Sequence, residues 1–430
     1  MDATIKQTNC LQAYQATRSH SLKLIAHLSA EDCSLQAAPF VSPAKWHLAH
    51  TTWFFETFIL IPSFPDYQPF HKDFQVLFNS YYNGIGEQFS RPKRHLLSRP
   101  SLEQVLDYRQ HIDAKMESLL EIANDDIKAL VVLGLNHEQQ HQELLLMDLK
   151  YCFFQNPLFP NYYPDQQLKS SPLLSENSSQ NRNHSRHTIE PIQFVIFEAA
   201  LAKVGVDNHL VADQQGFYFD NETPSHSSYV SSYQLADRLV SNGEYLQFIE
   251  DGGYEDASIW LSDGWAWLAE VKANKQQTTD SELECAPLYW VKQNGQWYEF
   301  TLHGLRQLDL YAPVRHVNFY ESLAYAEWSG CRLATEAEWE YGIQQKEKAF
   351  SQVYDEVWQW TQSAYQPYPG FEKPLGAVGE YNGKFMCNQM VLRGGCQLTS
   401  DHHTRPTYRN FFYPQDQWPM TGIRLAKSAE

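Results

Sequence analysis

Residues 136–143 read Asn136-His137-Glu138-Gln139-Gln140-His141-Gln142-Glu143, and this stretch decides how the first half of the chain is interpreted. On a helix, residues four apart lie one turn above each other, so His137 and His141 present two imidazoles to one point. Apolar residues on either side predict that this helix is buried. A buried imidazole nitrogen needs a partner, which is either a metal ion or a carbonyl or carboxylate oxygen.

A second histidine pair lies upstream in Ser42-Pro43-Ala44-Lys45-Trp46-His47-Leu48-Ala49-His50-Thr51-Thr52-Trp53-Phe54-Phe55-Glu56. Ser42 is a typical N-cap and Pro43 a typical first helical residue. Two apolar helices that carry histidines are what a metal in the core of a helical bundle requires.

Three nitrogen ligands are therefore available. Either His47 or His50 joins His137 and His141, and an all-nitrogen set with open positions suits Fe(II) or Zn(II). The spacing of the second pair also resembles a zinc-protease helix, in which Glu138 would act as the general base.

Composition narrows the partners and the compartment. The 430 residues include 51 acidic and 33 basic side chains, for a formal charge of −18. This balance argues against nucleic acid and anionic membrane surfaces as partners, and otherwise fits ordinary solubility. Seven scattered cysteines fit free thiols in a reducing cytosol. With no targeting segment and no long apolar run, we predict a cytoplasmic protein.

The pattern along the chain predicts three parts. These are a helical bundle over 1–164, a flexible polar linker over 165–190 and an irregular α+β domain over 191–430. The helices expected from capping and periodicity are 11–27, one after Pro43, 101–123 behind the capping box Ser101-Leu102-Glu103-Gln104, one around Asn136, 240–250 and 320–341.

Four motifs of the second half resemble a known fold. They are, in chain order, Arg332-Leu333-Ala334-Thr335-Glu336-Ala337-Glu338-Trp339-Glu340-Tyr341, Trp358-Gln359-Trp360-Thr361, Val391-Leu392-Arg393-Gly394-Gly395 and Thr421-Gly422-Ile423-Arg424-Leu425. Together they resemble the formylglycine-generating-enzyme fold, which is related to C-type lectins. The copper-binding cysteines of that oxidase are not evident, because residues 397–409 contain no cysteine. The resemblance therefore does not extend to formylglycine chemistry.

The first half resembles the DinB-like four-helix bundle, a metal-binding scaffold. A bundle followed by a lectin-like domain is similar to the ergothioneine-pathway sulfoxide synthases. Those enzymes use non-haem Fe(II) and O2 to join a thiol sulfur to an imidazole carbon of trimethylhistidine (hercynine), and they also oxidise the sulfur. The resemblance implies that the ligands are His50, His137 and His141, and that His47 belongs to the core or to the layer behind the ligands.

The same resemblance assigns contacts to the trimethylated substrate. Its fixed ammonium is best met by aromatic faces and amide oxygens. The family position falls on Asn410, Phe411 and Phe412, and Gln140 reaches in from the metal-binding helix. Core packing is the alternative for the two phenylalanines.

The thiol substrate would be held by Arg91 and Arg94, whose guanidinium groups can clamp a carboxylate. A solvated basic stretch is the alternative for this pair.

Two subtypes of the family differ in thiol substrate and in the position of the active-site tyrosine. The subtype that uses γ-glutamylcysteine carries the tyrosine in the second domain, where this chain reads Pro374-Leu375-Gly376-Ala377. The subtype that uses cysteine has a tyrosine pair in the bundle, and Phe78-Asn79-Ser80-Tyr81-Tyr82 resembles it. We therefore predict cysteine as the thiol and Tyr81 or Tyr82 as the catalytic proton or hydrogen-atom donor.

Other functions remain open at this point. Enzymes on the same scaffold act on γ-glutamylcysteine, on histidine or on a selenium donor. A zinc-dependent DinB-like thiol transferase or hydrolase would use the same three histidines. A lectin-like binding module fused to an inert bundle would hold no metal.

Overall fold

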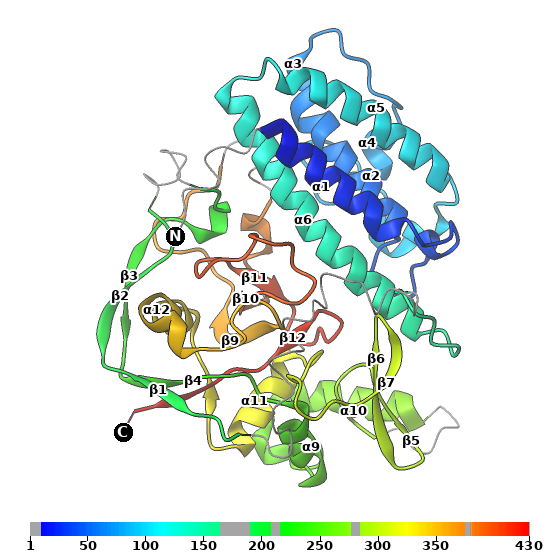
Figure 1. Ribbon diagram of the computed structural model, residues 1–430. Coiled ribbons are helices and arrows are strands. Elements are labelled where there is room, and N and C mark those ends of the chain that lie inside the picture. The colour runs from blue at the N-terminus through cyan, green and yellow to red at the C-terminus, as the bar shows by residue number, and fades with distance from the viewer. Residues whose placement is uncertain are drawn as a thin grey trace.

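The computed structural model describes residues 10–163, 190–207, 216–276, 284–374, 379 and 381–429. A helical bundle forms the first part and a sheet-rich domain the second (Figure 1), which confirms the predicted α+β class. The predicted linker lies outside the described residues except for Glu190, so the domain boundaries stay predictions.

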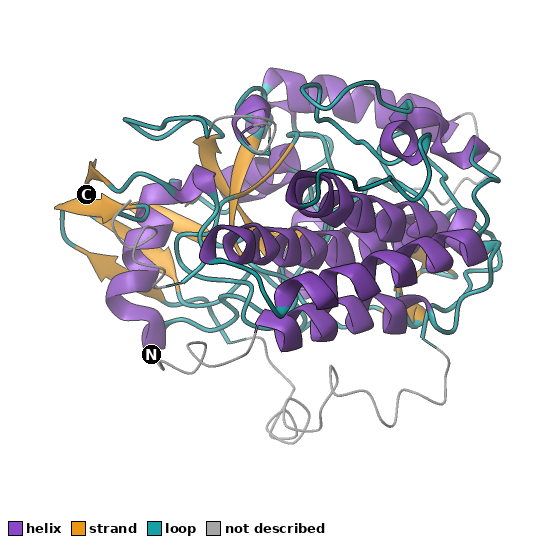
Figure 2. Ribbon diagram, turned by 90° about the horizontal axis from the view of Figure 1, so that it is seen from above, coloured by secondary structure: helices purple, strands orange, loops and turns teal. Residues whose placement is uncertain are grey.

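Four long helices form the bundle, as predicted. With the shorter segments between them, they are α1 (Cys10–Ile25), η2 (Asp32–Ser34), α2 (Ala44–Phe55), the π-helical η3 (Glu56–Leu60), α3 (Ile61–Ser63), α4 (Phe74–Leu77), η4 (Arg91–Leu96), α5 (Leu102–Leu120) and α6 (Asp125–Phe154). α2 packs against α5 and α6, and α1 against α6. Seen from above, these helices lie roughly side by side (Figure 2).

Helix α5 begins at the predicted capping box. The Ser101 hydroxyl accepts a hydrogen bond from the Gln104 N–H at 3.3 Å, and the Gln104 side chain accepts one from the Ser101 N–H at 2.9 Å. Two backbone donors that the helix itself leaves free are thereby satisfied.

Helix α2 begins one residue later than predicted. Pro43, rather than Ser42, occupies the N-cap position, and no side chain caps the helix. Ser42 has other partners: its N–H donates to Asp148 at 2.8 Å, and its hydroxyl accepts from Arg94 at 2.8 Å. These tertiary contacts replace the local capping bond that the sequence indicated.

The second domain contains two four-stranded sheets, one of three strands and one of two. Their strand orders are β1-β4-β13-β8, β11-β10-β9-β12, β5-β6-β7 and β2-β3, and β12–β9 is the one parallel pair among the described strands. The strands are β1 (Phe194–Phe197), β2 (Ala200–Val204), β3 (His226–Val230), β4 (Tyr233–Ala236), β5 (Trp290–Gln293), β6 (Gln296–Thr301), β7 (Gly304–Gln307), β8 (Arg332–Leu333), β9 (Trp358–Ala364), β10 (Met390–Gly394), β11 (Asn410–Phe412), β12 (Thr421–Gly422) and β13 (Leu425–Ser428).

The helices of this domain correct the prediction at two places. They are η7 (Asp220–Glu222), α9 (Asn242–Glu250), η8 (Ala257–Ile259), α10 (Ser262–Gln276), α11 (Phe319–Trp328), α12 (Glu336–Lys346), η9 (Glu347–Ala349) and η11 (Gly383–Phe385). The single helix expected over 320–341 is wrong. Gly330 adopts a φ of 65°, which ends α11, and a capping box at Thr335 starts α12 after the short strand β8. Helix α10 was not predicted, because the half-buried Trp265 and Trp267 and the buried Leu268 follow no clear helical period.

Helix α6 faces the second domain along much of its length (Figure 1). Glu143 accepts hydrogen bonds from Trp358 at 2.7 Å and from Thr399 at 2.6 Å. Two turns further on, the Lys150 ammonium lies 2.8 Å from His316. Glu143 and Lys150 are both buried, and this burial lowers the pKa of Lys150 to about 7 and raises that of Glu143 to about 7.

No helix among the described residues combines the length and the apolar composition that crossing a membrane demands.

Candidate metal centre

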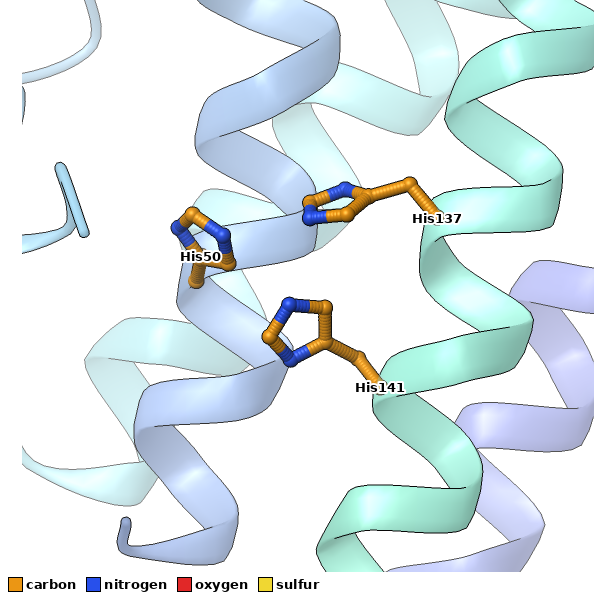
Figure 3. Close-up of side chains that lie close together, drawn as sticks. All are labelled: His50, His137 and His141. Carbon is orange, nitrogen blue, oxygen red and sulfur yellow. The ribbon is translucent and has the colours of Figure 1, made fainter. Parts of the chain in front are cut away.

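Helices α2 and α6 bring together the three histidines that the family resemblance implied. His50 comes from α2, and His137 and His141 come from successive turns of α6 (Figure 3). One ring nitrogen from each lies within 4.8 Å of the other two. The three imidazole planes are tilted by 63–79° to one another, with ring centroids 4.6–5.0 Å apart.

A glycine lets the two helices approach this closely. Gly134 lies one turn before His137, and a Cβ atom there would stand 2.6 Å from the ring of Phe55 and 3.0 Å from that of Phe54. Any larger residue would push α2 away from α6. The close approach of α2 and α6 therefore depends on Gly134, which has no side chain to separate them.

The ring of His50 is fixed on three sides. Its Nδ1–H donates to the carbonyl oxygen of Phe78 at 2.6 Å, and the indoles of Trp46 and Trp53 stack on its two faces at 4.7 and 5.6 Å. Its other nitrogen, Nε2, is buried without a hydrogen-bond partner among the described residues. This arrangement aims a single lone pair at the other two histidines.

His141 is oriented by His47, the histidine that the resemblance placed in the core or behind the ligands. The two Nδ1 atoms are 2.9 Å apart, and His47 Nε2 lies 3.0 Å from the Asp148 carboxylate. Because a carboxylate accepts, His47 carries its proton on Nε2 and accepts at Nδ1 from the Nδ1–H of His141. His141 Nε2 is left as a lone pair directed into the cluster.

Both ring nitrogens of His137 are buried with no hydrogen-bond partner among the described residues. Burial lowers its pKa to about 3 and holds the pKa values of His50 and His141 well below the ordinary value of 6.5. Three neutral imidazoles with unpartnered nitrogens at one point match the donor set of an Fe(II) or Zn(II) site with open positions.

Glu138 does not lie where a zinc protease needs its general base. Its carboxylate accepts from Arg18 at 2.9 Å, from Ser21 at 2.5 Å and from Arg109, all inside the bundle. Although burial opposes the charge, these two guanidinium groups lower its pKa to about 2. Glu138 therefore anchors α6 within the bundle, and the zinc-protease interpretation is wrong.

The second domain places a tyrosine beside the centre that the sequence analysis did not find. The ring of Tyr381 lies 5.5 Å from that of His137, and its hydroxyl donates to the Gln140 side-chain oxygen. The Gln140 amide in turn donates to the Tyr408 hydroxyl at 2.6 Å. Tyr381 lies four residues after 374–377, the tract in which the sequence shows no tyrosine. No periodic pattern marks this segment, so only the three-dimensional structure shows that Tyr381 lies beside the centre.

The candidate catalytic pair lies at the junction of the two domains. Tyr82 is fully buried, and its ring lies 5.6 Å from Trp53 and 5.0 Å from Phe58. Tyr81 stacks on Tyr82 at 4.6 Å and meets Phe385 of the second domain edge-on at 5.1 Å. Tyr81 therefore faces the second domain, and Tyr82 the bundle core.

The candidate ammonium contacts lie on β11. Phe411 stacks on Tyr365 at 4.1 Å and continues to Phe385 at 5.9 Å, which joins it to the tyrosine pair. Phe412 packs edge-on against Trp418 at 5.6 Å, and the side chain of Asn410 accepts from the Phe411 N–H at 2.9 Å. Phe411 thus belongs to an aromatic wall that reaches the tyrosine pair, whereas the Phe412 contact is with the domain's own core.

Arg91 and Arg94, the candidate clamp for the thiol carboxylate, differ in burial and in their contacts. Arg94 is buried, lies 3.3 Å above the ring of Trp46 and donates to Ser42 at 2.8 Å and Ser80 at 3.3 Å. Its charge is one of the influences that lower the pKa values of His50 and His141, which places it near the centre. Arg91 is exposed and donates to the carbonyl oxygen of Phe40.

Comparison with known proteins agrees with this division of the chain. Residues 194–356 and 350–429 match the family described as the sulfatase-modifying factor enzyme 1-like domain, and residues 13–145 match the DinB superfamily.

Individual relatives cover different parts of the chain. The hercynine oxygenase of Mycobacterium tuberculosis (strain ATCC 25618 / H37Rv) is 25% identical over 95% of this chain and 96% of its own length. Ergothioneine biosynthesis protein 1 of Schizosaccharomyces pombe is 28% identical over 49% of this chain and 28% of its own length. The formylglycine-generating enzyme of Bos taurus is 25% identical over 39% of this chain and 47% of its own length.

The predicted pairing of a DinB-like bundle with a formylglycine-generating-enzyme-like domain is therefore confirmed. Because the match to the second domain extends over more than half of the chain, the protein belongs to the sulfatase-modifying factor enzyme 1-like family, with a DinB-superfamily bundle preceding the family's domain.

Proposed function

We propose that this protein is an Fe(II)- and O2-dependent sulfoxide synthase of ergothioneine biosynthesis. It couples the sulfur of cysteine to the imidazole of trimethylhistidine and oxidises the sulfur. The observation that carries the proposal is a buried cluster of three neutral histidines facing tyrosines and an aromatic wall of a second domain. Similarity to hercynine oxygenases over nearly the whole chain supports the same reaction.

Iron, when bound by His50, His137 and His141, would supply open positions and a redox-active centre that passes electrons from the substrates to O2, which zinc cannot do. The protein contributes by keeping all three ligands uncharged. Burial holds their pKa values far below neutrality, so the full charge of the cation remains available to stabilise a thiolate.

Tyrosine hydroxyls supply the proton or hydrogen atom. Burial raises the pKa values of Tyr81 and Tyr381 above the ordinary value of 10, so both stay protonated at neutral pH and act as donors. Tyr381 is held through Gln140, on the helix that carries two of the ligands. Tyr81 remains the better candidate of the predicted pair, because Tyr82 is enclosed by the bundle core.

Cysteine remains the proposed thiol, although one of the arguments for it from the sequence no longer holds. One of the two arguments was the lack of a tyrosine in the second domain, and Tyr381 beside His137 removes it. The remaining argument is the tyrosine pair in the bundle. Arg94, with Arg91 at the domain junction, is the proposed clamp for the carboxylate of the thiol.

The test is anaerobic reconstitution with Fe(II), addition of trimethylhistidine and a thiol, admission of O2 and mass spectrometry of the products. We expect a product that contains both substrates plus one oxygen atom with cysteine, and none from zinc-loaded protein or from His137→Ala. Product with γ-glutamylcysteine alone would overturn the choice of thiol. No coupled product with either thiol, despite bound iron, would overturn the synthase; selenium donors would then be tested on the iron form and thiol transfer on the zinc form.

A further inference from the structure

A half-buried carboxylate in the second domain, that of Asp220, lies between the two aromatic groups that approach the metal centre. Asp220 accepts a hydrogen bond from the Asn382 side chain at 2.5 Å through one oxygen, Oδ1. The other oxygen, Oδ2, is buried and accepts no hydrogen bond from the described residues. A buried carboxylate oxygen without a donor is costly and rare in a folded protein, so it calls for an explanation.

The neighbours of Asp220 in the chain fix its position relative to the site. On one side, Phe219 stacks on Tyr381 at 5.6 Å, and Tyr381 reaches His137. On the other side, the Asn221 amide donates to the Tyr365 hydroxyl at 2.9 Å, and Tyr365 carries the stacked ring of Phe411.

Three tyrosines from separate segments sense this carboxylate. Its negative charge is among the causes that raise the pKa values of Tyr81, Tyr365 and Tyr381, after burial, which is the largest cause for each. Burial also raises the pKa of Asp220 itself, against the effect of hydrogen bonds from the Asn382 side chain and from the backbone N–H groups of Asn221 and Asp220. A carboxylate among tyrosine rings is the environment that a positively charged nitrogen prefers, because the rings offer their negative faces and the carboxylate a full charge.

We propose that Asp220 is the counter-charge for the ammonium group of an amino-acid substrate, held between Tyr81, Tyr381 and the Tyr365–Phe411 pair. The inference rests on the proposed function and adds to it a specificity-determining residue that neither the metal ligands nor the motifs indicated. Two substrates carry such a group, the trimethylammonium of trimethylhistidine and the primary ammonium of cysteine. In either case the cation balances a carboxylate that the protein itself leaves half-satisfied.

The experiment compares charged ligands with neutral counterparts on full-length, iron-loaded protein under anaerobic conditions, by isothermal titration calorimetry. One pair is trimethylhistidine and its analogue with a tert-butyl group in place of trimethylammonium. The other is cysteine and 3-mercaptopropionate. We expect the wild-type protein to prefer the charged member of one pair by about 10- to 100-fold, and Asp220→Asn to reduce this preference to about 1 while iron content is unchanged.

Two further variants complete the test. Asp251→Asn removes the same charge from an exposed turn after α9 and should leave the preference intact. Asn382→Ala removes the hydrogen bond to Oδ1 and should lower the preference partly, which gives a second measurement if Asp220→Asn folds poorly. The pair that loses its preference identifies the substrate.

Three outcomes would overturn the proposal, and they differ in what else they imply. If wild-type protein binds all four ligands without preference for charge, there is no ammonium subsite. If its preference survives both Asp220→Asn and Asn382→Ala, the subsite lies elsewhere. If it binds none of the four ligands, the proposed function fails and the subsite fails with it.

Discussion

Replacing His47 with alanine should weaken metal binding without abolishing it. His47 lies between Asp148 and His141 in a chain of two hydrogen bonds of 3.0 and 2.9 Å, and the side chains of His47 and Asp148 are 3% and 2% exposed. These two hydrogen bonds keep the proton of His141 on Nδ1 and leave its Nε2 free for the metal. Without His47, the Nδ1–H of His141 loses its acceptor, and the ring can rotate or change tautomer.

The expected loss of metal affinity follows from what hydrogen-bond partners of metal ligands contribute in other proteins. A hydrogen-bond partner behind a metal ligand is typically worth about 10- to 100-fold in metal affinity, or about 1.4 to 2.8 kcal/mol. We expect His47→Ala to fall in this range. Asp148→Asn should cost less, about 10-fold, because an amide oxygen still accepts from His47. His141→Ala removes a ligand and should abolish binding at micromolar metal.

The assay is competition for Zn(II) and, anaerobically, for Fe(II) against a chelating dye, with thermal unfolding followed in parallel. His316→Ala is the matched control: this histidine is also buried, and it contacts the same helix through Lys150, nine residues beyond His141. It should cost stability while leaving metal affinity unchanged. If His47→Ala binds metal within twofold of wild type, or if both variants lose affinity equally, the orientation argument is refuted.

Four other substitutions test separate parts of the structure. Tyr81→Phe should lower the rate of coupled product at least tenfold in the reconstitution assay with little change in melting temperature, whereas Tyr82→Phe should alter mainly the melting temperature; the reverse pattern would exchange their roles. Phe411→Ala should weaken trimethylhistidine binding about tenfold with iron content unchanged, and equal loss of both would indicate misfolding instead. Glu138→Gln should destabilise the fold by about 3 to 5 kcal/mol in urea unfolding, because two buried arginines lose their counter-charge. The folded pKa of Glu138, about 2, lies below its ordinary value of 4.5, so its contribution to stability is complete above pH 4.5 and is lost as the pH falls toward 2; wild-type stability that is flat over this interval would contradict the ion pairs.

Local sequence rules were sufficient where the structure depends on local interactions. The capping box at Ser101 places the start of α5, and the four-residue spacing of His137 and His141 places both on one face of α6. Both features need only the geometry of a single helix, which the sequence states directly. The break between α11 and α12 shows the limit, because the left-handed Gly330 ends a helix that composition alone would continue.

Residues of the second domain that complete the site could not be found in this way. Tyr381 and Gln140 are 241 positions apart in the chain and meet only because α6 docks against a loop between β9 and β10. Asp220 likewise begins a single short turn of helix, η7, and belongs to no periodic pattern. Such contacts are set by how the domains pack, and a single sequence has no periodic signal for packing between irregular segments.

Helix α6 contacts other parts of the protein on three sides, and these contacts couple the metal centre to the second domain. His137 and His141 point toward α2, while Gln140, Glu143 and Lys150, spaced three and seven residues apart, point to the second domain. On a third side of the same helix, Glu138 forms an ion pair with Arg18 inside the bundle. A helix held on three sides moves as a rigid body, so any shift in domain docking displaces two of the three ligands together. Disruption of the Glu143–Trp358 contact, which involves neither a proposed metal ligand nor a proposed substrate contact, should therefore change metal affinity and substrate affinity in parallel.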